Sequence, residues 1–471
     1  MHRVPLIYIC AAVAAICGCN SDSSRDRDAV AGAEEKQVNP PRVIVPGDDQ
    51  IIAPDETGIA RTVTPTGSID TRSLFFQNIG INGRACVSCH VANQGWTITP
   101  DGVRKRFDRT KGLDPLFRAV DGSNSPLADV RTEDARRRSF SMLLRRGLIR
   151  IGIGIHAGAE FELAAVDDPY HFASAAELSL FRRPLPTASL SFLSTVMWDG
   201  RENLAGMTIL QDLTHQSNSA TQAHAQKVDP ITDAQRADIV SFETGIFFSQ
   251  ELDFQAGILH EAGAGGGAVA LSKTPFHIGI NDTLGADPTG QPFNPVAMTM
   301  FDAWAGLNKG QEGRTRGAVA RGQALFNSKP IQISDVRGLN DALGVPTLQG
   351  TCTTCHNTPG VGDHSVALPL DIGLTDPSRR TSDMPLYTLR NIATGELYQT
   401  TDPGKALITG KWKDRSRFKG PILRGLAARA PYFHNGFAAS LAEAVDFYDT
   451  RFGIGFNAQE KSDLETFLRS L

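Results

Sequence analysis

The clearest chemistry in this sequence is carried by two identical patterns of cysteine and histidine. They read Cys-Val-Ser-Cys-His at residues 86–90 and Cys-Thr-Thr-Cys-His at residues 352–356. Two thiols three positions apart can each add to a vinyl group of one haem, and the histidine that follows can place its imidazole on the iron. We therefore predict two covalently bound haem c groups, with one histidine of the chain on each iron. The residues predicted to hold them are Cys86, Cys89 and His90 for the first haem and Cys352, Cys355 and His356 for the second.

Zinc binding and disulfide exchange are the alternative uses of paired cysteines. A zinc site commonly combines two Cys-x-x-Cys pairs that lie about 15–20 residues apart, whereas residues 89 and 352 are far apart in this chain. A redox disulfide of the thioredoxin type needs no histidine after the second cysteine. Haem attachment accounts for both the spacing and the histidine.

The first residues predict export. Arg3 precedes an apolar run from Val4 to Cys17, which has the length of a signal-peptide core and is too short to span a membrane permanently. The run ends in Ile-Cys-Gly-Cys at 16–19, which resembles the bacterial lipobox. Residues 1–18 are therefore predicted to be a lipoprotein signal peptide, with Cys19 as the lipidated residue; ordinary cleavage to a free periplasmic protein is the alternative.

The residues after Cys19 predict a tether. Segment 19–60 is polar, acidic and proline-containing, with little that could pack, so we expect it to be flexible. The folded part would then be periplasmic, and only its lipid anchor would contact a membrane.

Length and composition bound the folded part. A chain of 471 residues can form two domains, which we place at 61–312, with the first haem, and 313–471, with the second. The net charge of −4 and 41% hydrophobic residues are typical of a soluble globular protein without a basic excess, so nucleic acid is excluded as a partner.

Helix starts are indicated by capping pairs, in which Ser, Thr or Asn is followed three residues later by Glu or Gln. These pairs are Thr232 with Gln235, Ser440 with Glu443, and Asn457 with Glu460. A further helix is expected after Gly313, and the best strand signal is at 148–155. We predict a mainly α fold of two cytochrome c-like haem domains with long loops and insertions.

Two further segments resemble one known family. Residues 197–201, Met-Trp-Asp-Gly-Arg, and the segment from Pro421 through Ala-Pro-Tyr-Phe-His-Asn-Gly at 430–436 to Val445 are similar to signatures of the bacterial di-haem cytochrome c peroxidases and the related MauG enzymes. The resemblance covers most of 75–95, 180–250, 315–360 and 415–471. The segments between these ranges, including 100–180, look like insertions, and the sequence does not indicate their function.

The resemblance implies that the first haem meets peroxide and the second passes electrons. The peroxidases have a methionine as second ligand of the electron-transfer haem, but the match places Tyr448 there, as in MauG. A tyrosinate would lower the reduction potential that a thioether would raise. The alternative is that Tyr448 is a packed aromatic residue, and Met384, Met298 and Met300 are then the candidate ligands.

The resemblance also implies residues around the haems. The family's distal glutamine and glutamate correspond to Gln216 and, in place of the acid, His224, each of which could instead be an ordinary helix or loop residue. Trp198 matches a tryptophan between the haems, and His434 matches a position near the second haem; both could be core side chains. Family members bind calcium, but the asparagine expected before Pro186 is missing, so calcium stays open.

Three functions remain on this basis. The first is reduction of hydrogen peroxide to water with electrons from a small redox protein, a cytochrome c or a cupredoxin. The second is a MauG-like oxidase or oxygenase acting on an organic or protein substrate. The third is a non-catalytic electron carrier or redox sensor. The first is preferred, and the sequence gives no indication of oligomeric state.

Overall fold

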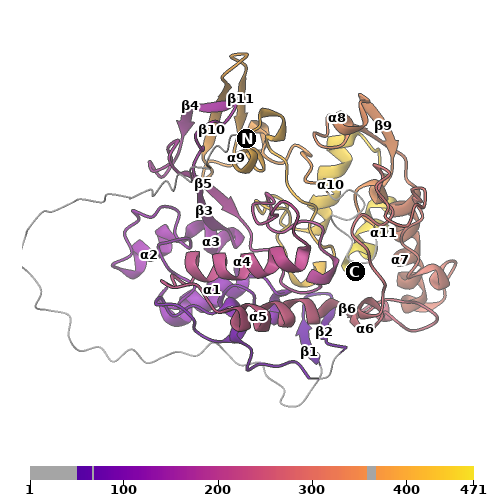
Figure 1. Ribbon diagram of the computed structural model, residues 1–471. Helices are drawn as coiled ribbons and strands as arrows, with labels where there is room; N and C mark the ends of the chain where they lie inside the picture. Colours follow the sequence, from indigo (N-terminus) through magenta and orange to yellow (C-terminus); the bar gives the residue numbers. More distant parts are fainter. Residues whose placement is uncertain (1–49, 66–67, 358–367) are drawn as a thin grey trace, which may run out of the picture. The chain divides into compact units, whose positions relative to one another are not determined.

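The computed structural model describes residues 50–65, 68–357 and 368–471 (Figure 1). The predicted signal peptide and the predicted lipidation site, Cys19, lie outside the described residues. Within the described ranges, no helix combines the length and the apolar character needed to cross a membrane.

Helices are distributed along the whole described chain (Figure 1). They are α1 (Pro100–Thr110), α2 (Glu133–Ser139), α3 (Ser141–Arg146), α4 (Ile209–Ala223), α5 (Asp233–Gly245), α6 (Ala268–Ser272), α7 (Gly310–Ser328), α8 (Asn340–Leu343), α9 (Ala406–Thr409), α10 (Leu441–Phe452) and α11 (Ala458–Arg469).

Strands form several small antiparallel sheets. They are β1 (Gln50–Pro54), β2 (Gly58–Val63), β3 (Ile149–Ile153), β4 (Phe161–Asp167), β5 (Leu178–Arg182), β6 (Phe247–Asp253), β7 (Gly257–Ile258), β8 (Ile331–Ser334), β9 (Thr347–Gly350), β10 (Leu386–Asn391) and β11 (Leu397–Thr400). The orders are β1-β2-β6-β7, β11-β10-β4, β3-β5 and β8-β9.

The predicted mainly α fold class is wrong, because the protein is mixed α/β, with 33% helix and 16% strand. The expected strand at 148–155 is present as β3, but its partner β5 is buried along its whole length and shows no alternation of polar and apolar residues. β4 pairs with β10, more than 200 residues later in the chain (Figure 1). Neither a fully buried strand nor such a distant pairing leaves a local periodic signal.

The predicted helix starts are confirmed where capping pairs mark them. Thr232 and Asn457 cap α5 and α11 in complete capping boxes, each with the side chain of the third residue bonded back to the cap. Ser440 caps α10 by accepting the N–H of Glu443, whose carboxylate bonds Ala439 N instead of the cap residue. The helix expected after Gly313 begins slightly earlier, at the first residue of α7.

Packing of α7 against α11 supports the second cysteine pattern. Gly322 of α7 allows close contact, since a Cβ atom there would lie 2.1 Å from the carbonyl oxygen of Asp463 in α11. Phe326 and Phe467 continue this interface in a buried apolar cluster. Phe326 also contacts the ring of His356, so the interface reaches the second motif.

Two predicted domain boundaries fall inside secondary-structure elements. The predicted tether, 19–60, extends too far, because β1 and the start of β2 already pair with each other inside it. The predicted boundary between residues 312 and 313 falls inside α7, and the division into two haem domains stays a prediction.

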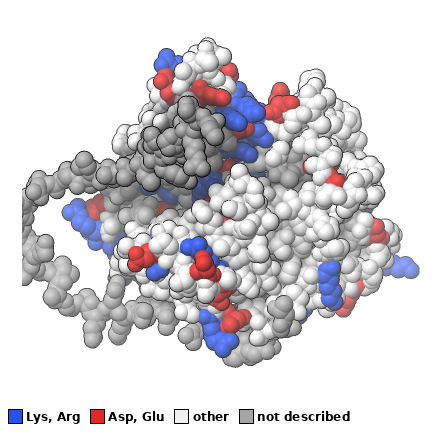
Figure 2. Space-filling model, viewed as in Figure 1, with Lys and Arg blue, Asp and Glu red and all other residues white. Residues whose placement is uncertain are grey.

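Charged side chains at the surface are interspersed. Figure 2 shows basic and acidic groups side by side on one face, with wide areas that carry neither. Several ionic groups are instead buried, and Arg84, Arg182, Arg183 and Glu243 among them line a cavity.

Candidate haem sites

The first cysteine pattern forms a short 3-10 helix, Cys86–Ser88, at the wall of a cavity. The N–H groups of Cys89 and His90 both bond the carbonyl of Cys86, which brings both thiols and the imidazole to the same cavity. The Nδ1 atom of His90 lies 3.1 Å from the carbonyl oxygen of Trp96. Since a carbonyl can only accept, Nδ1 carries the proton and Nε2 is left to bind a metal. Burial lowers the pKa of His90 to about 4, so the imidazole is neutral at physiological pH.

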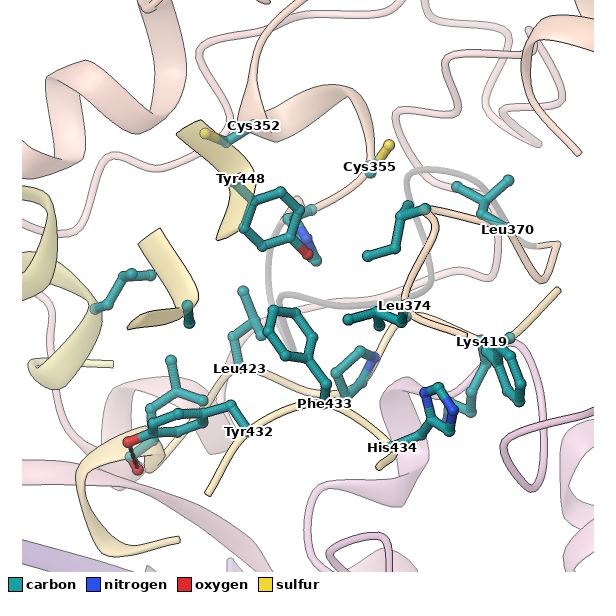
Figure 3. Close-up of a pocket in the computed structure, with 18 of the residues that line it drawn as sticks. Cys352, Cys355, Leu370, Leu374, Lys419, Leu423, Tyr432, Phe433, His434 and Tyr448 are labelled. Atoms are coloured by element: carbon teal, nitrogen blue, oxygen red, sulfur yellow. Dashed lines mark hydrogen bonds between the residues drawn. The ribbon is translucent and has the colours of Figure 1, made fainter. Parts of the chain in front are cut away.

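The second pattern repeats this geometry. Cys352–Thr354 is again a 3-10 helix, and the N–H groups of Cys355 and His356 bond the carbonyl of Cys352. Cys352 and Cys355 (Figure 3) line a second, largely apolar cavity, and His356 lines the same cavity. Burial raises the pKa of Cys352 and of Cys355 to about 12, so both thiols stay protonated in the folded chain.

Tyr448 of α10 lines the second cavity (Figure 3), which His356 lines as well. The two ring centroids lie 6.3 Å apart and the rings are nearly perpendicular. Every other described tyrosine donates or accepts a hydrogen bond through its hydroxyl: Tyr170, Tyr387, Tyr398 and Tyr432. The hydroxyl of Tyr448 makes none within the described ranges. A hydroxyl that lines a cavity beside a histidine and has no partner among the described residues is free to bind a group held there, which favours an iron ligand over a packed aromatic residue.

The alternative methionine ligands lie elsewhere. Met384 packs with Met142, Leu148 and Phe181 in a separate cluster. Met298 is in the core beside α7, and the sulfur of Met300 contacts Arg424 at 3.3 Å. These three methionines are not part of the lining of the cavity that holds His356.

Both cavities fit haem c. Their empty space, open mouths included, is about 1800 Å³ for the second and about 1340 Å³ for the first. Each presents two thiols and a histidine within apolar walls, which matches the needs of a covalently bound porphyrin.

Buried cations near the cavities also fit a haem. Arg183 lines both cavities, Arg429 lines the second, and the hydrogen bonds of both guanidinium groups within the described ranges go to main-chain carbonyls. Burial, together with neighbouring Arg429, lowers the pKa of Arg183 to about 9. His434 lines the second cavity with both ring nitrogens buried and, among the described residues, without a partner. Carboxylates such as haem propionates would satisfy these groups.

Helix α4 places the predicted distal residues at the first cavity. The residues of α4 that line this cavity are spaced as on one face of a helix. They are Leu213, Gln216, Ser217, Ala220 and Thr221, with His224 at the end of the helix. Gln216 and His224 thus share the cavity of His90, as expected from the sequence. Their roles in catalysis stay predictions.

Trp198 lines both cavities and so lies where a residue between two haems would lie. Its indole N–H donates to the carbonyl of Arg183 at 2.7 Å. The neighbouring Asp199 is fully buried and bonds Arg182 at 2.5 Å, while Arg182 also forms two hydrogen bonds with Asp402. This buried network connects β5 with the Trp-Asp-Gly-Arg segment and with the later part of the chain.

Two residues at the first cavity were missed by sequence reasoning. Glu243 of α5 lines this cavity, and burial raises its pKa to about 8, so its carboxyl is protonated at neutral pH. Its place four residues after Ile239 on the apolar face of α5 was a usable signal. Asp121, behind the cavity, is the second, and nothing in its local sequence distinguishes it from a surface acid.

For calcium, the described residues contain no group of three or more His, Cys, Asp or Glu side chains that could hold a metal ion. Calcium binding therefore stays an expectation from the family resemblance alone.

Comparison with known proteins gives partial matches. No family model matches the chain. It is 32% identical over 193 residues to the cytochrome-c peroxidase IdrP1 of a Pseudomonas species, which is 36% of this chain and 43% of that protein. It is 32% identical over 141 residues to the cytochrome-c peroxidase IdrP2 of Denitromonas iodatirespirans, covering 28% and 38%. It is 32% identical over 123 residues to the cytochrome c551 peroxidase of Nitrosomonas europaea, covering 26% and 30%.

The chain thus spans less than half the length of each of these relatives. A solved structure, described as a MauG-like protein associated with microbial copper homeostasis, aligns over 85% of this chain and 86% of that one at 16% identity. Its TM-score of 0.36 is too low to show a shared fold. The named peroxidases confirm the family relationship predicted from the sequence, and the predicted oxidoreductase class agrees with their names.

Proposed function

The chain is a relative of the bacterial cytochrome c peroxidases, and on that premise we propose that it reduces hydrogen peroxide to water with electrons from a small redox protein. The overall reaction takes one peroxide, two electrons and two protons and gives two water molecules. The observation that carries this proposal is the inequality of the two cavities. His356 shares its cavity with Tyr448, whereas His90 shares its cavity with proton-handling side chains.

Two haem c groups are the proposed cofactors. Cys86 and Cys89 would hold the first and Cys352 and Cys355 the second, with His90 and His356 as ligands. When bound, haem supplies the iron that binds peroxide and the electrons that cleave its O–O bond. All other tasks fall to the chain.

At the first cavity, His224 and Gln216 are the proposed proton-handling pair. The Nε2 atom of His224 accepts a proton from one peroxide oxygen and returns it to the other, which leaves as water. The amide of Gln216 donates a hydrogen bond that orients the peroxide. The exposed surface of the walls around them is mostly apolar.

At the second cavity, Tyr448 and His356 would both be ligands of the haem that Cys352 and Cys355 would hold. With two ligands from the protein, this haem would pass electrons and would not bind peroxide. Trp198, which lines both cavities, is the proposed route between them.

A MauG-like oxidase is the second candidate, and Tyr448 is the observation that favours it. A tyrosinate donates negative charge and holds iron in the ferric or a higher state, which suits oxidation of an organic or protein substrate better than delivery of electrons. Turnover with a reduced cytochrome c or cupredoxin distinguishes the two candidates.

For location, we propose a periplasmic protein held at a membrane by lipid on Cys19. This rests on the sequence of residues 1–19 and agrees with a redox partner that is itself a small exported protein.

The test is peroxide turnover by purified holo-protein carrying two haems. Two equivalents of reduced donor should be oxidised per peroxide. Gln216→Ala and His224→Gln should slow turnover, the latter roughly 10²–10⁴-fold. The matched controls are Gln222→Ala and His215→Gln, which change exposed residues of the same helix that lie outside the cavity. Electron paramagnetic resonance that shows two low-spin haems inert to peroxide would contradict both enzymatic candidates.

A further inference from the structure

Asp121 holds the imidazole of His224 from behind the first cavity. The Nδ1 atom of His224 and the Oδ2 atom of Asp121 are 2.6 Å apart. Asp121 is buried, and its own carbonyl accepts the N–H of Arg150 at 2.7 Å, which fixes its backbone. It belongs to the segment 100–180, which the sequence showed only as an insertion without visible role.

Arg84 holds the other side of the same carboxylate. Its Nη1 atom lies 2.6 Å from Oδ1 of Asp121, an ion pair between two side chains that are both less than 10% exposed. The guanidinium also donates to the carbonyls of Pro115, Leu116 and His224. Burial alone would raise the pKa of Asp121, but Arg84 and His224 together lower it, so the group is a carboxylate at neutral pH.

This arrangement decides which nitrogen of His224 carries the proton. A carboxylate can only accept hydrogen bonds, so the Nδ1 atom of neutral His224 must be the donor. The Nε2 atom then has a free lone pair. Since His224 lines the cavity that contains Cys86, Cys89 and His90, this lone pair is available to a ligand of the first haem.

We propose that Asp121, held by Arg84, is a positioning residue that keeps His224 in the tautomer able to accept a proton in the first haem cavity. The proposal rests on the proposed function, because it explains why His224 can accept a proton during peroxide reduction. It also gives the segment 100–180 a role: it supplies the carboxylate that supports a residue of α4.

The test uses Asp121→Asn in the full-length ferric holo-protein. Arg84 can only donate, so the amide oxygen of the variant must face Arg84 and its NH2 group must face His224. Nδ1 of His224 then becomes the acceptor, and Nε2 carries the proton and can no longer take one.

Cyanide binding is the readout that does not depend on turnover. Hydrogen cyanide must lose its proton before its carbon binds iron, so a base at the cavity speeds the reaction. In stopped-flow absorption, Asp121→Asn should slow cyanide association and peroxide reaction by roughly 10²-fold or more, and His224→Gln should have the same effect. The double variant should be no slower than either single variant, because both remove the same function. Asp121→Glu, which keeps an acceptor-only group, should retain most of the rate and serves if Asp121→Asn does not fold.

Two matched controls report on general damage. Asp168→Asn removes a buried carboxylate of the same segment that accepts the N–H groups of Tyr170, Phe172 and Ala173 and does not line the cavity. His215→Gln removes a histidine of α4 that also contacts a carboxylate, Glu202 at 2.6 Å, but lies outside the cavity. Both should leave cyanide association unchanged.

Each other result overturns the proposal in a distinct way. If cyanide association were slow in His224→Gln but normal in Asp121→Asn, His224 would remain the base and Asp121 would have no role in positioning it. Unchanged rates in both would show that His224 is not the base. Loss of a low-spin signal in His224→Gln would make His224 an iron ligand. Holo-protein in which the first haem binds neither cyanide nor peroxide would instead contradict the proposed function itself.

Discussion

Replacing Tyr448 by phenylalanine distinguishes an iron ligand from a packed aromatic residue. The ring that remains keeps its contacts with Phe433, Phe447 and Phe452, and only the hydroxyl is lost. Within the described ranges this hydroxyl has no hydrogen-bond partner, so its removal breaks no hydrogen bond within these ranges. If Tyr448 served packing alone, Tyr448→Phe would therefore be at least as stable as the unchanged protein.

If Tyr448 ligates the second haem, the result is different. The ferric holo-protein should lose one low-spin signal in electron paramagnetic resonance and gain a high-spin signal, while the reaction of the first haem with peroxide stays the same. Tyr448→Met should restore a low-spin haem with a higher reduction potential, because a thioether favours ferrous iron. Chemical denaturation, spectroscopy and potentiometry on the same samples measure all three effects.

Tyr432→Phe is the matched control, since Tyr432 lines the same cavity but donates its hydroxyl to the carbonyl of Leu426 at 2.9 Å (Figure 3). This variant should lose about 1 kcal/mol of stability and leave the haem spectra unchanged. Unchanged spectra in Tyr448→Phe, with equal or higher stability, would refute the ligand assignment and the inequality of the two haems.

Three further predictions concern the scaffold. Asp199→Asn removes one carboxylate from buried Arg182, and the free energy of unfolding in urea should fall by roughly 3–5 kcal/mol; an unchanged value would mean that this ion pair contributes nothing. Burial would raise the pKa of Asp199, but its arginine partners hold this pKa at about 2. The stabilisation by the Asp199 carboxylate is therefore complete above the unfolded pKa of about 4 and disappears as the pH falls from about 4 to about 2. Unfolding measured along an acid titration should show a weaker pH dependence in Asp199→Asn than in the unchanged protein. Gly322→Ala places a Cβ atom 2.1 Å from Asp463 O and should lower the free energy of unfolding, measured by calorimetry, by about 1–3 kcal/mol. Gly313→Ala in the same helix, where the nearest atoms lie 3.7 Å from the added Cβ, should not lower it. Equal effects would show that helix propensity, and not close packing against α11, determines the stability change at Gly322.

The site was more predictable than the fold. Cys86, Cys89 and His90 could be proposed from the sequence because thioether formation would demand one fixed spacing, and capping boxes such as Thr232 with Gln235 are equally local. β4 and β10 could not be predicted, since the signal for each strand lies in the other, far away in the chain.

Residues that are proposed to act by positioning another side chain could not be predicted from the sequence either. His224 was identified from its place after the Trp-Asp-Gly-Arg segment, and the structure puts it in the expected cavity. Asp121 contacts it from a segment about 100 residues earlier, and only the folded chain shows that contact. Glu243 is the intermediate case, because an acid on the apolar face of α5 is visible in the sequence but its cavity is not.

The spread of the second cavity's lining residues along the chain bears on the maturation of the protein. The second cavity is lined by residues from Thr97 to Leu468, so it can close only when nearly the whole chain has been delivered. Once it has closed, the thiols of Cys352 and Cys355, with pKa values of about 12, are poor nucleophiles. The two cysteines are therefore more reactive before the cavity closes than after it. Because contacts between distant segments form slowly, a cavity built from segments this far apart closes late in folding, which leaves an interval in which haem could be loaded.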